Sequence, residues 1–174
     1  MTSSSRTLGD LFGAFEQEAF RLETKDDYSK SGNIDAYQAF MAGEPQPDDY
    51  NAGWVEALRS HRSQGKRIYR VHILTRPLTG YLRFELGWGY AKNMTGGEEF
   101  FILDVTEKTN PLEGVPDFWL FDSTHAAVMR YDDHGAFLGA EVLAPNGPTE
   151  FTRHRDTALA HAEPFTDWWA KYGE

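Results

Sequence analysis

Alternation of apolar and polar residues along the chain predicts its strands. RIYRVHIL, residues 67–74, is rich in β-branched and aromatic residues and places Tyr69, Val71 and Ile73 on one face. The opposite face of this strand carries Arg70 and His72. Shorter apolar runs predict further strands at residues 20–24, 99–104, 117–122, 126–131 and 136–143. The turn residues 132–135 between the last two runs are typical of an antiparallel hairpin.

Apolar residues spaced by three and four predict the helices. The first helix is expected at residues 8–18, and the second runs from an N-cap at Asn33 to a stop at Gly43. A third is expected at 52–65, and the C-terminal tail is expected to be a helix bent at Pro164. Pro77 suits the first turn of a helix over residues 78–86, although LRFEL within it also fits a strand. Residues 88–97 contain three glycines and are predicted to be a connector.

The order of these elements predicts one domain over residues 1–174, with an α/β fold in which helices flank a mixed sheet as a sandwich. An α+β fold with an antiparallel meander is the alternative. The core is expected in the strands at 68–74, 99–103, 118–121 and 126–131, packed against the first and last helices. Trp119 is expected to be a buried core residue.

Composition excludes several classes of function. The chain has no cysteine, so disulfides, thiolate nucleophiles and zinc sites with sulfur ligands are excluded. Its formal charge of −10 disfavours direct binding to nucleic acid and would suit a basic DNA-binding regulator as a partner. No apolar run is long enough to span a membrane, and the first residues do not look like a signal peptide. We therefore expect a cytoplasmic protein that does not bind membranes.

Known motifs for nucleotides, metals and nucleophiles are missing. No glycine-rich phosphate loop, no His-Glu-x-x-His and no Gly-x-Ser-x-Gly occurs, and the six histidines are widely spread. The sequence therefore predicts no metal and no cofactor.

Two groups of residues are the candidates for a binding or catalytic site. Asp104 and Asp122 each end a hydrophobic strand, where they could meet at a sheet edge or could simply cap turns. The second group, from one strand and the following helix, could line a cleft or form buried ion pairs: Arg70, His72, Tyr81, Arg83, Glu85 and Trp88. On a helix, Glu85 would face the sheet and could contact Arg70, whereas Arg83 would point elsewhere.

Several segments resemble an uncharacterised actinobacterial family of about this length. They include Tyr-Leu-Arg-Phe-Glu at 81–85, Asp-Phe-Trp-Leu-Phe-Asp at 117–122 and Phe-Leu-Gly-Ala-Glu at 137–141. The resemblance implies a domain of unknown function that is often encoded near helix-turn-helix regulators, and it supplies no catalytic residues.

The order of elements from residue 67 onward is also similar to half of a phospholipase D-type domain. That class of enzyme needs a His-x-Lys motif, and neither His72 nor His125 has lysine two positions later. This similarity therefore implies a copy without phosphodiesterase chemistry.

These observations support two hypotheses about function. The first is a non-enzymatic module that binds a protein partner or a small ligand in a regulatory system. The alternative is a small biosynthetic or hydrolytic enzyme that uses a cleft lined by Arg70, Arg83, Glu85, Asp104 and Asp122. Convergence of these groups on one pocket would favour the enzyme.

Overall fold

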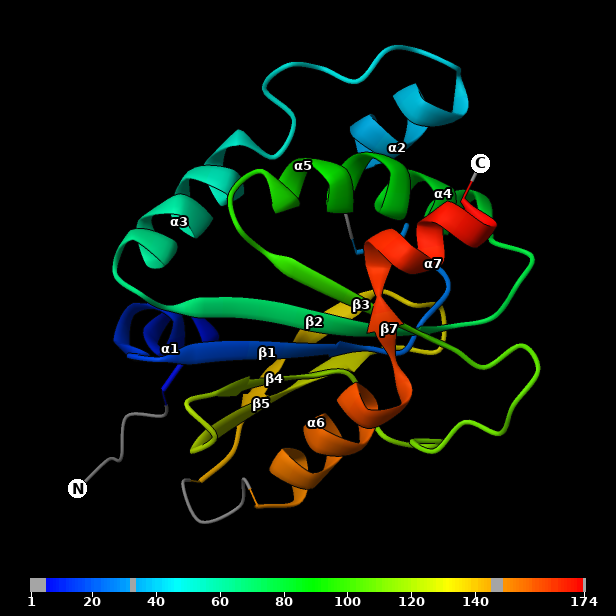
Figure 1. Ribbon diagram of the computed structural model, residues 1–174. Coiled ribbons are helices and arrows are strands. Elements are labelled where there is room, and N and C mark those ends of the chain that lie inside the picture. The colour runs from blue at the N-terminus through cyan, green and yellow to red at the C-terminus, as the bar shows by residue number, and fades with distance from the viewer. Residues whose placement is uncertain (1–5, 32–33, 145–148, 174) are drawn as a thin grey trace.

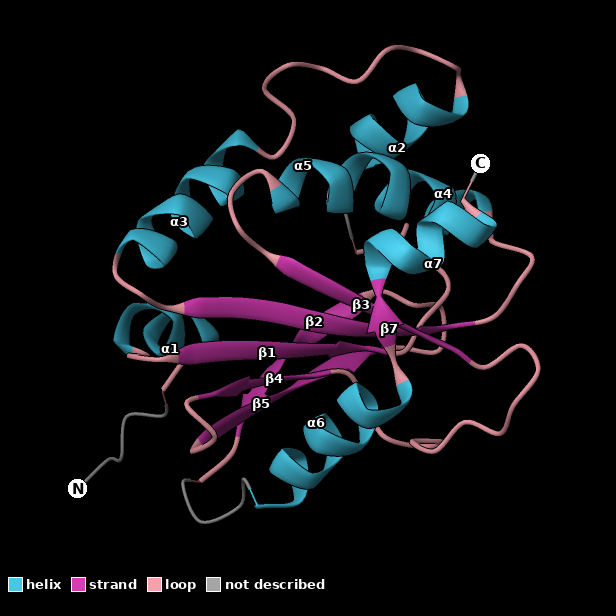
Figure 2. Ribbon diagram, in the orientation of Figure 1, coloured by secondary structure: helices cyan, strands magenta, loops and turns pink. Residues whose placement is uncertain are grey.

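The computed structural model describes residues 6–31, 34–144 and 149–173, which form helices on both sides of one sheet (Figures 1 and 2). The sheet has seven strands in the order β6-β5-β4-β1-β2-β3-β7. The strands are β1 (Glu18–Glu23), β2 (Arg67–Leu74), β3 (Glu99–Asp104), β4 (Phe118–Phe121), β5 (His125–Tyr131), β6 (Phe137–Val142) and β7 (Glu163–Pro164).

The pairing of the strands makes the sheet mixed, as the sequence predicts. β1, β2 and β3 are parallel, whereas β4, β5 and β6 run antiparallel to their neighbours and form the meander. The short strand β7 pairs antiparallel with β3. The α/β fold with a mixed sheet is therefore confirmed, and β1 lies at its centre.

The helices differ in which face of the sheet they cover. They are α1 (Leu8–Ala14), α2 (Ile34–Met41), α3 (Ala52–Ser63), α4 (Gly80–Phe84), the π-helical turn η1 (Glu85–Tyr90), α5 (Ala91–Met94), α6 (Thr149–His161) and α7 (Phe165–Tyr172). Figure 1 shows α6 on one side of the sheet and α3, α5 and α7 on the other. None of the described helices is long and apolar enough to cross a lipid bilayer.

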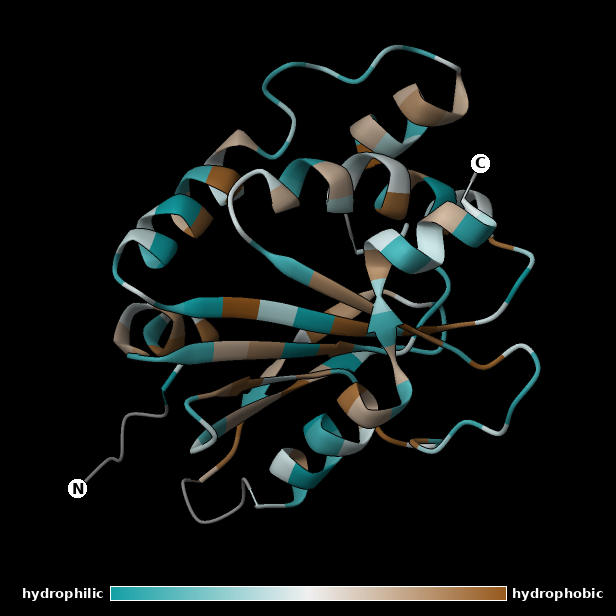
Figure 3. Cartoon of the chain, in the orientation of Figure 1, coloured by the Kyte–Doolittle hydropathy of each residue, from teal (hydrophilic) through white to brown (hydrophobic). Residues whose placement is uncertain are grey.

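Side chains along β1 and β2 point alternately to the two faces of the sheet, so the core is divided between the α6 side and the opposite side. Phe20 and Leu22 of β1 and Tyr69 and Val71 of β2 pack with Phe151 and other residues on the α6 side. The opposite face is apolar at its two ends, where Ala19 and Ile68 pack under α1 and α3, and Leu74 packs under α4 and α7. Between these ends, the same face carries charged residues, and hydrophilic positions interrupt hydrophobic ones along β2 (Figure 3).

Several predicted boundaries need correction. The first helix ends at Ala14 rather than near residue 18, because β1 already begins at Glu18. Residues 88–97 are not a connector, since η1 and α5 continue the helix to Met94. The C-terminal tail is two helices, and Pro164 lies in strand β7 between them. The predicted N-cap Asn33 lies outside the described residues.

Candidate functional site

A cluster of ionisable side chains is buried between the sheet and the helices α3, α4 and η1. We call it the polar cluster; its members are Arg21, Glu23, Arg70, His72, Glu85, Glu98 and Asp117. β1 and β2 pair in parallel with Arg21 opposite Arg70 and Glu23 opposite His72. Because residues two apart on a strand share a face, these four side chains project side by side into the same layer.

Arg70 is the centre of the ionic contacts in this cluster. Its Nη1 donates to Glu23 at 2.7 Å, and its Nη2 donates to Glu98 at 2.6 Å. Burial alone would raise the pKa of Glu23, but its neighbours, Arg70 first among them, together outweigh this effect and hold the pKa well below its usual range. Glu98 also accepts from the indole N–H of Trp54 at 3.3 Å. Its pKa is raised by burial, against the opposing effect of Arg70.

A second buried ion pair joins β1 to the loop before β4. Arg21 donates to Asp117 at 3.0 Å, and their side chains are 7% and 1% exposed. Asp117 also accepts from the hydroxyls of Thr24 and Tyr28 and from the backbone N–H of Thr24. This pair is therefore well satisfied on its carboxylate side, as a buried charge requires.

His72 is completely buried and is oriented by two hydrogen bonds. Its Nε2 lies 2.7 Å from the carbonyl oxygen of Lys25, and its Nδ1 lies 2.9 Å from the hydroxyl of Tyr90. A carbonyl oxygen only accepts, so Nε2 carries a proton. In the neutral ring, Nδ1 therefore keeps a lone pair directed toward the interior of the cluster.

Glu85 brings a further carboxylate to this lone pair from the first residue of η1. Its Oε2 lies 3.6 Å from Nδ1 of His72 and is buried without a hydrogen-bond partner among the described residues. Burial raises the pKa of Glu85 well above its usual 4.5, and the nearby Glu23 raises it further. Glu85 is consequently a carboxyl group that favours its protonated form.

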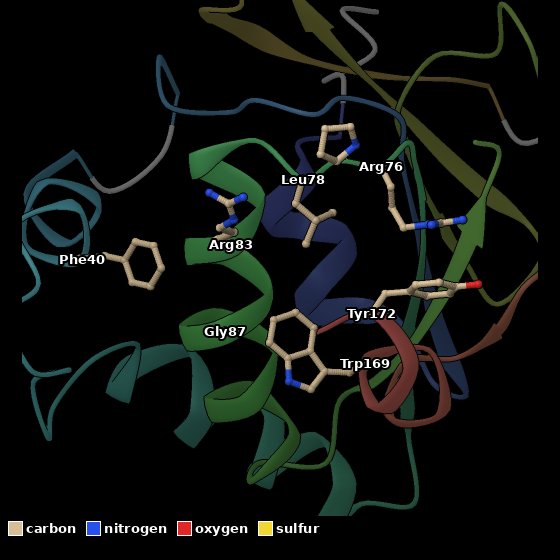
Figure 4. Close-up of a pocket in the computed structure, with 8 residues that line it drawn as sticks. Phe40, Arg76, Leu78, Arg83, Gly87, Trp169 and Tyr172 are labelled. Carbon is tan, nitrogen blue, oxygen red and sulfur yellow. The ribbon is translucent and has the colours of Figure 1, made fainter. Parts of the chain in front are cut away.

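Two cavities adjoin this part of the molecule. One, of about 270 Å³, reaches the polar cluster from the side of α3 and is lined by Tyr50, Asn51, Trp54, Arg70, Tyr81, Phe84, Glu85, Gly89, Tyr90 and Asn93. The other, of about 450 Å³, lies between the loop after β2, the α4–η1 helix, α2 and α7 (Figure 4). Its lining residues are Phe40, Arg76, Pro77, Leu78, Arg83, Gly87, Trp169 and Tyr172, and we call it the aromatic pocket.

The two strand-end aspartates do not form a joint site. β3 and β4 run in opposite directions in the sheet, so Asp104 and Asp122 lie at opposite ends. Asp122 accepts backbone N–H groups of Glu16, Gln17 and Glu18 at 2.7–3.0 Å, which is a capping role. Asp104 accepts from Thr106, Arg76 and Trp168. Its pKa falls to about 2, because these hydrogen bonds outweigh its partial burial.

The other residues that the sequence suggested for a site lie in three different parts of the structure. Arg70, His72 and Glu85 do meet, with Tyr81 lining the cavity beside them. Arg70 binds Glu23 and Glu98 at the distances above rather than the predicted partner Glu85, which lies nearest His72. Arg83 lines the aromatic pocket instead. Trp88 packs edge-on against Phe40 and Tyr50 in an aromatic cluster under α2.

Sequence reasoning missed the members of the polar cluster that come from other segments: Arg21, Glu23, Glu98 and Asp117. A signal for the first two was present, because Arg21 and Glu23 alternate with the apolar Phe20 and Leu22 as Arg70 and His72 alternate with Tyr69 and Val71. Two adjacent strands with this pattern place charges in the same buried layer.

Replacing Glu85 by glutamine is expected to stabilise the protein at neutral and higher pH. A carboxyl group with a raised folded-state pKa binds its proton more tightly when folded, so it lowers stability as pH rises above its unfolded value of 4.5. The advantage of Glu85→Gln should therefore be near zero at about pH 4 and grow by up to about 1.4 kcal/mol for each pH unit above that, until the folded pKa is reached.

Urea denaturation of Glu85→Gln and of the wild type across this pH range measures the effect. The control is Glu141→Gln, which removes a carboxylate from an exposed pair with Arg130 and should show little dependence on pH. A loss of stability in Glu85→Gln at high pH would instead mean that Glu85 is an ionised, paired group, as the sequence-based interpretation holds.

The sequence matches a known family model, and no curated protein matches the sequence. The matching family model is described as a domain of unknown function (DUF6879), and it covers residues 6–170. This range includes every strand of the sheet, the polar cluster and nearly all of the lining of the aromatic pocket. The chain therefore belongs to the DUF6879 family.

Proposed function

We propose that this protein is a binding module that takes a small anionic, aromatic molecule in the aromatic pocket. The observation that carries the proposal is the pocket itself, whose 450 Å³ lies within the range of small-molecule sites. Like such sites, it combines a mostly apolar and aromatic lining with a small number of polar groups. Here the polar groups are two guanidinium groups.

The two arginines indicate the charge of the ligand. Arg76 is held in place because its Nε donates to Asp104 at 2.6 Å and its guanidinium stacks over the ring of Tyr172, 3.9 Å from the centroid. A planar guanidinium fixed in this way is suited to recognise a carboxylate or phosphate. Arg83 lines the same cavity from α4. The aromatic rings of Phe40, Trp169 and Tyr172 offer flat apolar surfaces to the rest of the ligand (Figure 4).

The distribution of candidate residues favours binding over catalysis by the cleft that the sequence suggested. Arg70 and Glu85 belong to the polar cluster, Arg83 lies in the aromatic pocket, and Asp122 caps a turn at the far end of the sheet. An enzyme that used these groups together would need them around one reacting centre.

The wider setting of the protein is also a proposal. The net charge of −10 supports a protein that does not bind DNA itself and that associates with a basic DNA-binding regulator. A cytoplasmic location is a separate part of the proposal. Actinobacterial origin, neighbouring regulator genes and a phospholipase D-like ancestry remain predictions from the resemblances described above.

A fluorescent probe with the proposed chemistry tests the pocket. Anilinonaphthalene sulfonate combines flat aromatic rings with one anionic group and becomes brighter when it leaves water. We expect it to bind the folded protein at one saturable site. Gly87 lines the pocket, and a Cβ atom added there meets no atom within 4 Å, so the side chain of Gly87→Leu starts in open space and should extend into the cavity.

Gly87→Leu is expected to weaken binding of the probe by about tenfold or more, since the side chain occupies the ligand volume. Gly53→Leu is the matched control: Gly53 lies in α3, away from the pocket, and its added Cβ also meets no atom within 4 Å. Equal binding by both variants, or no saturable binding to the wild type, would contradict the proposal.

A further inference from the structure

We infer that Glu23, His72 and Glu85 form a binding site for one divalent transition-metal ion. The site lies in the polar cluster, and it is separate from the aromatic pocket on which the proposed function rests. One ligand atom from each of the three residues lies within 4.8 Å of the other two. These atoms come from β1, β2 and η1, so the fold assembles the site from three distant segments.

The distances are close to those of a coordinated ion. Nδ1 of His72 lies 3.6 Å from Oε2 of Glu85 and 4.0 Å from Oε1 of Glu23. A tetrahedral ion with bonds of about 2.1 Å needs its ligand atoms about 3.4 Å apart. The histidine and Glu85 are thus almost in place. Oε1 of Glu23 also accepts from Arg70 at 2.7 Å, so an ion would share this carboxylate with the guanidinium.

The hydrogen bond from His72 to a backbone carbonyl is a further feature of metal-binding histidines. The carbonyl of Lys25 fixes the proton on Nε2 and leaves the lone pair of Nδ1 for the ion. Tyr90 also lies beside Nδ1 and beside Oε1 of Glu23, but its hydroxyl has only one proton for these two acceptors. Binding of an ion at Nδ1 would let that proton go to Glu23.

Charge in the polar cluster favours a divalent cation. Its four carboxylates are Glu23, Glu85, Glu98 and Asp117, with side chains between 0% and 14% exposed. Two guanidinium groups, of Arg21 and Arg70, oppose them. With His72 neutral and every carboxylate ionised, four negative charges against two positive ones leave a charge of −2 in a poorly hydrated space. One divalent ion balances this charge.

Oε2 of Glu85 supplies an independent indication. No N–H or O–H donor of the described residues reaches this buried oxygen, and the side-chain hydrogen bond of Glu85 is with the second carboxyl group, Glu23. A buried carboxylate oxygen without a donor is costly. Oε2 faces Nδ1 of His72, and Glu85 also lines the 270 Å³ cavity beside the cluster. The cavity gives an ion a route to the site and leaves room for water as a further ligand.

The ligand types indicate the class of metal. One imidazole nitrogen and two carboxylate oxygens suit Zn²⁺, Mn²⁺ or Fe²⁺ better than Mg²⁺ or Ca²⁺, which prefer oxygen ligands alone. Arg70 is the positive neighbour that opposes the ion, but Glu98 is paired with it and reduces its effect. The other groups that face the site, Tyr28, Tyr81 and Tyr90, are phenols whose pKa values burial raises, so they stay neutral.

Titration calorimetry with Zn²⁺ and with Mn²⁺ on the full chain tests this inference. We expect saturable binding of one ion per chain. Glu85→Gln should reduce the affinity by about tenfold or more, because it removes a ligand but keeps the shape and fold of the site. Glu141→Gln, at an exposed ion pair, should leave the affinity unchanged.

Co²⁺ gives a readout that a surface site would not. Coordination through Nδ1 places the Nε2–H proton of His72 near the paramagnetic ion, while its bond to Lys25 protects it from exchange. We expect one strongly shifted exchangeable proton in the NMR spectrum, and its absence in Glu85→Gln. Binding that Glu85→Gln does not weaken, or no saturable binding of any of these ions, would overturn the inference and leave protons as the neutralising charges.

Discussion

Replacement of Arg70 by methionine is expected to lower the free energy of unfolding by about 3–5 kcal/mol at neutral pH. Methionine has a similar length and fills most of the same space, so the cost arises from charge rather than from a cavity. Glu23 and Glu98 both bind Arg70, and their side chains are only 4% and 0% exposed. Without the guanidinium, each carboxylate must either ionise without a partner or take up a proton.

The loss should depend on pH. In the wild type the pKa of Glu23 is depressed, so its stabilising contribution is present above its usual 4.5 and is lost only as pH falls through the lower folded value. In Arg70→Met, the largest effect that opposes burial is lost, so this pKa should rise, which makes stability fall as pH rises. The difference between the two proteins should therefore be larger at about pH 8 than at pH 5.

Arg67→Met provides a matched control on the same strand. Arg67 pairs with Glu99, but both side chains are 43% exposed, so their ion pair should contribute less than about 1 kcal/mol. Urea denaturation of both variants at several pH values makes the comparison. If Arg70→Met costs no more than Arg67→Met, then water reaches Glu23 and Glu98, and the cluster is not the desolvated site that its geometry indicates.

Local patterns were sufficient to predict β1 to β6 and the class of fold, but not the short strand β7, which was predicted as part of a helical tail. β-branched and aromatic residues with a period of two identify β2, and the turn around Asp132 and Gly135 identifies the β5–β6 hairpin. These signals depend only on neighbours in the chain. The pairing of β1 with both β2 and β4 depends instead on contacts between residues that are about 50 and 100 positions apart. No pattern of neighbouring residues in the sequence specifies this pairing of strands.

The candidate site was predicted only in part, because sequence patterns identify residues that are near one another in the chain but not those that the sheet brings together. Arg70, His72 and Glu85 stand close together in the sequence, and the helix over residues 80–90 brings them together in space. Arg21 and Asp117 are 96 residues apart, and only the order of strands in the sheet makes them partners. The interpretation of Glu85 as a partner of Arg70 failed because Glu23, on the neighbouring strand, lies closer to the guanidinium.

Residues 88–97 show tertiary packing overriding local propensity. Three glycines favour a connector, yet the segment is helical as far as Met94. Leu86 and Tyr90 are fully buried, and Tyr90 stacks on Phe100 of β3 with ring centroids 3.8 Å apart. Burial of this kind outweighs the roughly 1 kcal/mol that a glycine costs in a helix. A π-helical turn is also a frequent feature of functional sites, which agrees with the position of Glu85 at its start.

Replacement of Trp119 by alanine is expected to lower the free energy of unfolding by about 3–5 kcal/mol, the usual cost of deleting a large buried aromatic ring. Trp119 is 7% exposed and lies on β4, where its ring contacts Phe12 of α1 edge-on and stacks with Phe121. The ring also lies 5.7 Å from the guanidinium of Arg70. Its removal therefore opens a cavity that joins the apolar core to the polar cluster.

The size of this loss distinguishes a core residue from a ligand-binding surface. Leu138→Ala is the control: Leu138 lies on the outer strand β6 and is 67% exposed, so its loss should cost no more than about 0.5 kcal/mol. Thermal and urea denaturation of both variants measure the difference. Unchanged unfolding of Trp119→Ala would mean that the ring is accessible in solution and available to a ligand. A loss at the upper end of the range would mean that Trp119 also shields Arg70 and its two carboxylates from water, which links the stability of the core to that of the cluster.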